Sequence, residues 1–129
     1  MGQQQLLLLV LSSIVVSMAT YTGVRLSEIH NQEQNRDRLQ TELIHIYIIA
    51  TEYKMKPKSF AGGSGSYTGF ELPNAYATEP GVSYWVGPSD QTLEMFASGS
   101  VTGSDGVNPV RVTFVAPSGS LQYQFAVAN

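Results

Sequence analysis

The sequence predicts an α+β protein in which a long N-terminal helix packs on a small C-terminal antiparallel β-sheet of about four strands. Three observations lead to this prediction. An uncharged run extends from Gln3 to Val24, a helical apolar pattern continues to about Tyr53, and the apolar spacing then changes to a period of two. The chain accordingly divides into a helix at 1–55, a Gly/Ser linker at 56–66 and a β-rich globular domain at 67–129.

Composition limits the classes of function that this chain can have. Of 129 residues, 43% are hydrophobic and 13% charged, with a net charge of −3 and a pI of about 5.2. This balance, with no basic cluster, argues against specific nucleic-acid binding. The lack of cysteine excludes disulfides and thiolate metal sites. A β-rich part of roughly 60 residues is marginally stable alone, so we expect it to pack on the second half of the helix.

The first half of the predicted helix, 3–24, is apolar on all sides. At ~1.5 Å of rise per residue it spans ~33 Å, which is close to the thickness of a bilayer's hydrocarbon core. A helix of this kind is buried either in lipid or among other protein helices. The residues expected in such a buried core are Gln5, Leu6, Leu7, Leu8, Leu9, Val10, Leu11, Ile14, Val15 and Val16.

The weakest helical stretch lies at the end of this half. Thr20 to Val24 combine β-branched residues with a glycine, and both are less favourable than alanine inside a helix. The composition predicts a hinge or local unwinding at Thr22 and Gly23. A continuous helix that tolerates one glycine is the alternative.

The second half, 25–55, is amphipathic and begins with a polar stretch from His30 to Arg38. Beyond that stretch, apolar residues recur at helical spacing along one face, which predicts that this face packs on the sheet. The residues of this packing stripe are Leu39, Leu43, Ile46, Ala50 and Tyr53. The helix should end at Pro57, because proline lacks a backbone donor and its ring clashes inside a helix. The following Gly/Ser residues are typical of a flexible connector.

Four segments with alternating apolar residues predict the strands of the sheet. They are Val82–Val86, Thr92–Ala97, Val110–Phe114 and Leu121–Val127, and a short extra strand is expected near Tyr67 to Leu72. Turns are expected at Gly87–Asp90 and Pro117–Gly119, and a small second hairpin at Asp105-Gly106. The resulting meander has one face for the helix and one for solvent or a neighbouring subunit.

Residues with catalytic or ligand-binding chemistry are sparse, and we predict no enzymatic activity and no cofactor. His30 and His45 lie ~22 Å apart along one helix and cannot share a metal ion within one subunit. The Gly/Ser linker lacks the lysine of a phosphate-binding loop. Ser89-Asp90 and Ser104–Gly106 offer too few carboxylates for calcium. Tyr84 and Trp85 are interpreted as core or subunit-contact residues, with an adhesive aromatic patch as the alternative.

An apolar half-helix after a short leader ending in glycine, an amphipathic half-helix and an antiparallel sheet resemble a type IV pilin. The residues that carry the resemblance are Met1-Gly2 followed by Gln3 to Leu11. In that family a membrane peptidase cuts after a glycine, which would place the cut after Gly2 and the new N-terminus at Gln3. The glutamate usual at the fifth mature position would then fall on Leu7, or on Gln5 if Met1 is the mature end.

The resemblance implies a subunit that polymerises through its hydrophobic helix into an extracellular pilus-like filament of identical copies. It also implies an inner-membrane precursor, a prepilin peptidase and a pilus assembly machinery, with adhesion, motility or DNA uptake as the filament's use. Two alternatives stay open: a pseudopilin of a type II secretion system, and a signal-anchored monomeric binding module of the periplasm or cell exterior. In a filament, the three glutamines Gln3–Gln5 could supply neutral hydrogen bonds where the family has a buried carboxylate.

Overall fold

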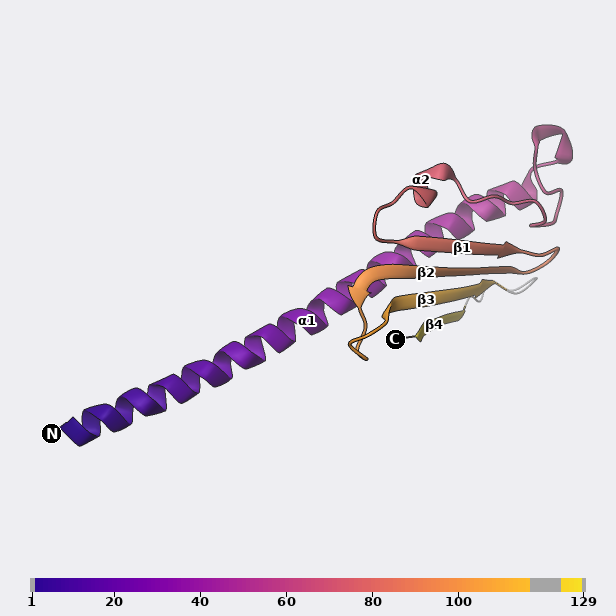
Figure 1. Ribbon diagram of the computed structural model, residues 1–129. Coiled ribbons are helices and arrows are strands. Elements are labelled where there is room, and N and C mark those ends of the chain that lie inside the picture. The colour runs from indigo at the N-terminus through magenta and orange to yellow at the C-terminus, as the bar shows by residue number, and fades with distance from the viewer. Residues whose placement is uncertain (1, 117–123, 129) are drawn as a thin grey trace. The chain divides into compact units, whose positions relative to one another are not determined.

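The computed structural model describes residues 2–116 and 124–128, the last five by their backbone. Helix α1 spans Gly2–Met55 and is followed by a 3₁₀ turn, η1, at Lys58–Phe60 and a short helix, α2, at Asn74–Ala77. The strands are β1 (Ser83–Pro88), β2 (Leu93–Thr102), β3 (Pro109–Ala116) and β4 (Gln124–Ala128). The layout predicted from the sequence, a long N-terminal helix and an antiparallel sheet, is confirmed (Figure 1).

The sheet is an antiparallel meander in the order β1-β2-β3-β4. Trp85 faces Phe96 across β1 and β2, and Phe96 faces Thr113 across β2 and β3. Because side chains alternate between the two faces of a strand, this register places Leu93, Met95 and Ala97 of β2 on the face opposite Phe96.

Two details of the predicted meander differ in the structure. Asp105 and Gly106 lie in the turn of the β2–β3 hairpin itself and do not form a separate small hairpin, because β2 continues to Thr102, which pairs with Pro109. Residues 67–72 form turns and irregular chain in place of a strand. The predicted turn at Pro117–Gly119 and the residues Leu121 to Tyr123 lie outside the described residues.

By internal contacts the chain divides into two compact units, Met1–Asn31 and Gln32–Asn129. The division falls inside α1 rather than in the predicted linker, because the second half of the helix packs with the sheet. In the core of the second unit, the helix residues Leu39, Leu43, Ile46 and Ala50 pack with buried residues of β2 and β3, and the partly buried Tyr84 and Val86 of β1 pack against this core. The buried residues on β2 and β3 are Leu93, Met95, Ala97, Val110, Val112, Phe114 and Ala116. Tyr47 adds a tilted aromatic contact with Phe114, at 5.2 Å between ring centroids.

The Gly/Ser segment after α1 is folded against the end of the helix, whereas the sequence predicts a flexible connector. The amides of Gly63, Ser64 and Gly65 donate to the carbonyls of Tyr53, Lys56 and Lys54 at 2.7–2.9 Å. These bonds satisfy carbonyls that a helix end otherwise leaves without a partner. Gly62 and Gly63 are buried there, and a Cβ on Gly62 would overlap the backbone of Lys56.

Candidate assembly surface

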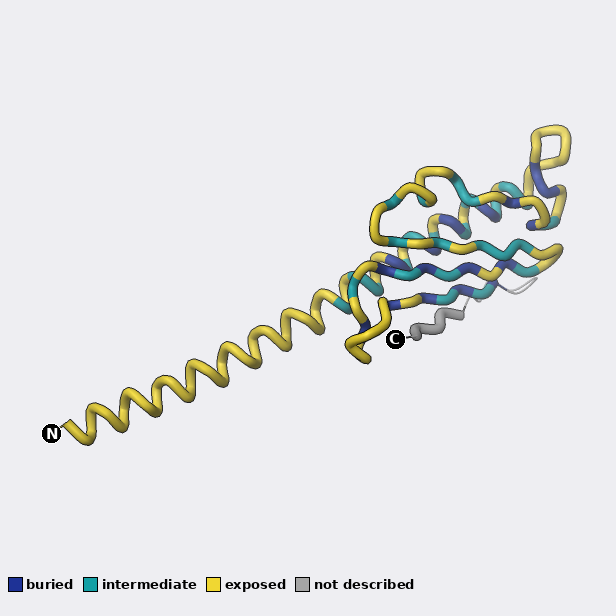
Figure 2. Tube along the Cα trace, viewed as in Figure 1, coloured by how far each residue is buried: buried dark blue, intermediate teal, exposed yellow. Residues whose placement is uncertain are grey.

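The apolar side chains of the first unit are all exposed. Every residue from Gly2 to Asn31 is exposed, which Figure 2 shows as an unbroken yellow stretch of helix. From Leu6 to Val16 the large apolar side chains are between 47% (Val10) and 72% (Leu9) exposed. Among the residues that the structure describes, none buries the side chains predicted for a buried core.

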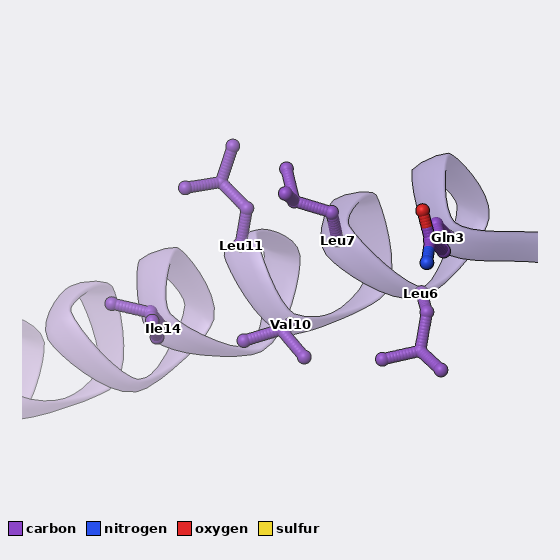
Figure 3. Close-up of a pocket in the computed structure, with 6 residues that line it drawn as sticks. All are labelled: Gln3, Leu6, Leu7, Val10, Leu11 and Ile14. Atoms are coloured by element: carbon purple, nitrogen blue, oxygen red, sulfur yellow. The ribbon is translucent and has the colours of Figure 1, made fainter.

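A shallow apolar groove runs along the first four turns of α1. It is lined by Gln3, Leu6, Leu7, Val10, Leu11 and Ile14. In Figure 3, Leu7 and Leu11 project on one side of the helix, Leu6 and Val10 project on another, and the Gln3 amide lies at the N-terminal end. Side chains spaced in this way form a hole into which a side chain of a neighbouring helix can insert.

The serine and threonine hydroxyls within the apolar half donate hydrogen bonds to the helix's own carbonyls. The hydroxyls of Ser12, Ser17, Thr20 and Thr22 donate to the carbonyls four residues earlier at 2.8–2.9 Å. Ser13 donates to the carbonyl of Val10 at 2.7 Å. Each of these five hydroxyls thus has an acceptor inside the helix, as a polar group in an apolar environment requires.

The helix is continuous through Thr22 and Gly23. A Cβ on Gly23 would meet no atom within 4 Å, so no close contact in this chain requires the glycine. The hinge stays a prediction for the chain in other surroundings. Likewise, Gly2 begins α1 and Gln3 lines the groove, and cleavage between them stays a prediction.

Tyr21 and Arg25 form a contact one turn apart where the apolar run ends. Arg25 Nε donates to the Tyr21 hydroxyl at 3.2 Å, and the guanidinium carbon lies 5.6 Å from the ring centroid. This hydrogen bond, more than the charge of Glu28, raises the pKa of Arg25 above its usual value. We did not predict this pair, although the i,i+4 spacing of an aromatic residue and an arginine is visible in the sequence.

The predicted packing stripe is placed as expected. Leu39, Leu43, Ile46 and Ala50 are fully buried, and Tyr53 is half-buried against the core. The hydroxyl of Tyr53 donates to the carbonyl of Thr68 at 3.2 Å, and its ring meets Phe70 edge-on at 5.7 Å. The stripe therefore belongs to the internal core of the second unit.

A polar network ties the helix to the segment before β1. Arg38 contacts Glu42 at 2.9 Å, one turn along the helix, and forms an ion pair with Glu79. Glu79 in turn accepts a hydrogen bond from the Tyr84 hydroxyl at 3.3 Å. The i,i+4 pair was detectable in the sequence, whereas the contacts with Glu79 and Tyr84 depend on the tertiary fold.

Trp85 lies on the sheet face opposite the helix and is 47% exposed. Its ring stacks on Phe96 at 5.0 Å, and the Arg111 guanidinium lies 5.6 Å from the Phe96 ring. Gly87 makes room for this arrangement, since a Cβ there would overlap the indole. Tyr84 points to the other side and packs with Tyr76, so the two neighbouring aromatics do not form one patch.

One helix among the described residues, α1, is long and apolar enough to cross a membrane, and its apolar window is not buried. Membrane anchors and signal sequences share these properties. Within the same residues, no group of three or more His, Cys, Asp or Glu is placed to hold a metal ion. Comparisons with protein-family models, curated proteins and solved structures give no match.

Proposed function

We propose that this chain is a structural subunit that polymerises through the first half of α1 into an extracellular type IV pilus-like filament. It has no enzymatic role in this proposal, and it is stored in the inner membrane before assembly. The observation that carries the proposal is that the large apolar residues from Leu6 to Val16 are all exposed, whereas the second unit has a buried hydrophobic core of its own.

Exposure of this surface to water is not a stable end state. Burying one leucine-sized side chain contributes about 1.5–3 kcal/mol, so nine such residues represent on the order of 10 kcal/mol or more. A bilayer supplies that burial to a monomer, and neighbouring copies of the helix can supply it in a polymer. The exchange of lipid for identical helices therefore allows the chain to leave the membrane.

The form of the polymer follows from a helix that is apolar and exposed on all sides, since two different faces of it can contact neighbouring copies. A head-to-tail contact whose rotation does not close generates an open helical filament rather than a ring. The groove from Gln3 to Ile14 provides holes for the side chains of a neighbour, and the sheet-containing unit would form the outer layer. Processing after Gly2 by a prepilin peptidase, and extraction by a pilus assembly machinery, come from the resemblance to type IV pilins.

Electron microscopy of the cell surface, combined with mass spectrometry of the N-terminus, tests the proposal. We expect filaments that contain this chain, and a reduced filament yield for the double variant Leu7→Ala, Leu11→Ala, which empties the groove while keeping it apolar. Ile48→Ala is the matched control, because Ile48 is 53% exposed but lies in the second unit.

The two alternatives predict different images. A pseudopilin would form short periplasmic fibres that need secretion genes, and a signal-anchored binding module would stay a monomer after extraction in detergent. Filament yields that are equal for the groove variant and for Ile48→Ala would contradict assembly through this surface. A filament-free surface with a lipid-bound monomer would overturn the proposed function as a whole.

A further inference from the structure

The contact between Tyr21 and Arg25 carries an inference about the membrane-inserted form, and this inference rests on the proposed function. We propose that Tyr21 and Arg25 anchor the inserted helix to the phosphates of lipid headgroups and so set the depth of the apolar run before assembly. The ligand class is a phosphodiester in a bilayer, and the binding group is the guanidinium of Arg25 held by the Tyr21 hydroxyl.

The length of the apolar run is suited to placing Tyr21 and Arg25 at a membrane interface. From Gln5 to Tyr21 a helix rises ~24 Å, and to Arg25 ~30 Å. Since the hydrocarbon core is ~30 Å thick, a helix with its glutamines at one interface carries Tyr21 and Arg25 at the other. Tyrosine is favoured at this depth because its ring is apolar and its hydroxyl polar.

The charge of Arg25 suits the same interface. Arg25 is the first charged side chain after the uncharged run, so it is the first one that an inserted helix brings to the interface. Lys and Arg near the ends of a membrane helix extend their charged groups toward the headgroups. Guanidinium groups bind phosphate in a planar, two-point geometry that lysine cannot reproduce.

The contact with Tyr21 preorganises the Arg25 side chain. A guanidinium has five N–H donors, and the bond to Tyr21 uses Nε. The terminal nitrogens can therefore donate to phosphate oxygens while Nε stays bound. Because the Tyr21 hydroxyl already holds the side chain in one direction, less side-chain entropy is lost when a phosphate binds.

A depth measurement in vesicles tests this anchor. The chain has no cysteine, so Met18→Cys gives a single site for a spin label in the otherwise unchanged full-length protein. We expect the label to lie within the hydrocarbon of phosphatidylcholine vesicles. Adding Arg25→Gln should move it about 3–5 Å deeper, which is two or three residues of helix rise, because the helix then slides inward. Tyr21→Phe, which removes only the hydroxyl, should give a smaller shift in the same direction.

Three controls test whether the change in label depth comes from binding of lipid phosphate by Arg25. Arg36→Gln removes the same charge from the second unit and should leave the depth unchanged. In vesicles of a phosphorus-free galactolipid, the difference between the labelled chain and its Arg25→Gln form should disappear, and a persistent difference would overturn phosphate binding. Inorganic phosphate at about 10 mM should not displace a helix held by a bilayer, where the headgroups present phosphate at a far higher local concentration.

The anchor and the proposed function fail in different ways. An inserted label whose depth is the same with Arg25 and with Gln at that position would overturn the anchor and leave the membrane-stored precursor intact. A label that never enters the hydrocarbon in the chain that retains Arg25 would contradict the membrane step of the proposed function itself.

Discussion

The two units of this chain differ in how far their hydrophobic side chains are buried. Among the residues of Gln32–Asn129 whose burial is described, thirteen hydrophobic residues are buried, and seven of the largest side chains are almost fully so. In Met1–Asn31 every described residue is exposed, leucines included. The same helix α1 thus has side chains buried in a hydrophobic core in its second half and exposed apolar side chains in its first half. A buried side chain should therefore affect the stability of the second unit, and an exposed one should affect only assembly or insertion.

The largest contrast is expected between Phe114→Ala and Leu9→Ala. Phe114 is fully buried, and its loss should lower the free energy of unfolding of the second unit by about 3–5 kcal/mol. Leu9 is 72% exposed, so its truncation should change that free energy by less than about 0.5 kcal/mol. Urea denaturation in detergent, followed by Trp85 fluorescence, measures both. Equal effects would show that the first unit is part of the same core.

A second contrast uses glycines. Gly62→Ala should destabilise the second unit by roughly 2 kcal/mol, because a methyl group there overlaps the backbone at the end of α1. Gly23→Ala meets open space and should instead strengthen the helix by about 1 kcal/mol. Thermal denaturation and helix content by circular dichroism distinguish the two. If Gly23→Ala impairs filament formation despite a stronger helix, the hinge predicted at Thr22 and Gly23 gains support.

Gln5→Leu tests the uncharged end of the helix. We expect membrane insertion to be unchanged and the filament yield to fall several-fold, because a buried hydrogen bond is worth about 1 kcal/mol. Filament length and order in electron micrographs, compared with a vesicle-insertion assay, measure the two properties separately. A normal yield of ordered filaments would remove the proposed role of this glutamine.

The smallest effect is expected at the exposed turn between β2 and β3. Asp105 accepts hydrogen bonds from the amides of Val107 and Asn108 and from the Asn108 side chain, and these bonds lower the pKa of Asp105. The ionised carboxylate therefore favours the folded state above about pH 4, and this contribution is lost as the pH falls through the lowered pKa. The melting temperatures of the parent and of Asp105→Asn should converge once the pH is below the lowered pKa of Asp105. A constant difference would show that the charge is irrelevant.

Much of the fold could be predicted because its signals are local. The spacing of Leu39, Leu43, Ile46 and Ala50 identifies a helix face without any knowledge of its partner, and period-two alternation identifies β2 and β3. Pro57 lies close to the observed end of α1 at Met55. For Leu6 to Val16 the all-round apolar pattern predicts a helix covered by lipid or by other helices, and these side chains are exposed in the single chain.

The features that were missed depend on contacts distant in sequence. The backbone bonds from Gly63 and Gly65 to the helix end turn a segment with linker composition into a cap. The ion pair between Arg38 and Glu79 joins residues from two elements. For Asp105-Gly106, turn chemistry was recognised, but the length of β2 was not, because Gly99 and the serines beside it obscure the alternation.

The hydroxyl groups along the apolar half of α1 have one further consequence. The hydroxyls of Ser12, Ser17 and Thr20 donate to carbonyls of their own helix. A change of surroundings from acyl chains to protein therefore leaves none of these three donors without an acceptor. If the proposed transfer from the membrane to a filament takes place, the hydrogen bonds of these three side chains need not be rearranged.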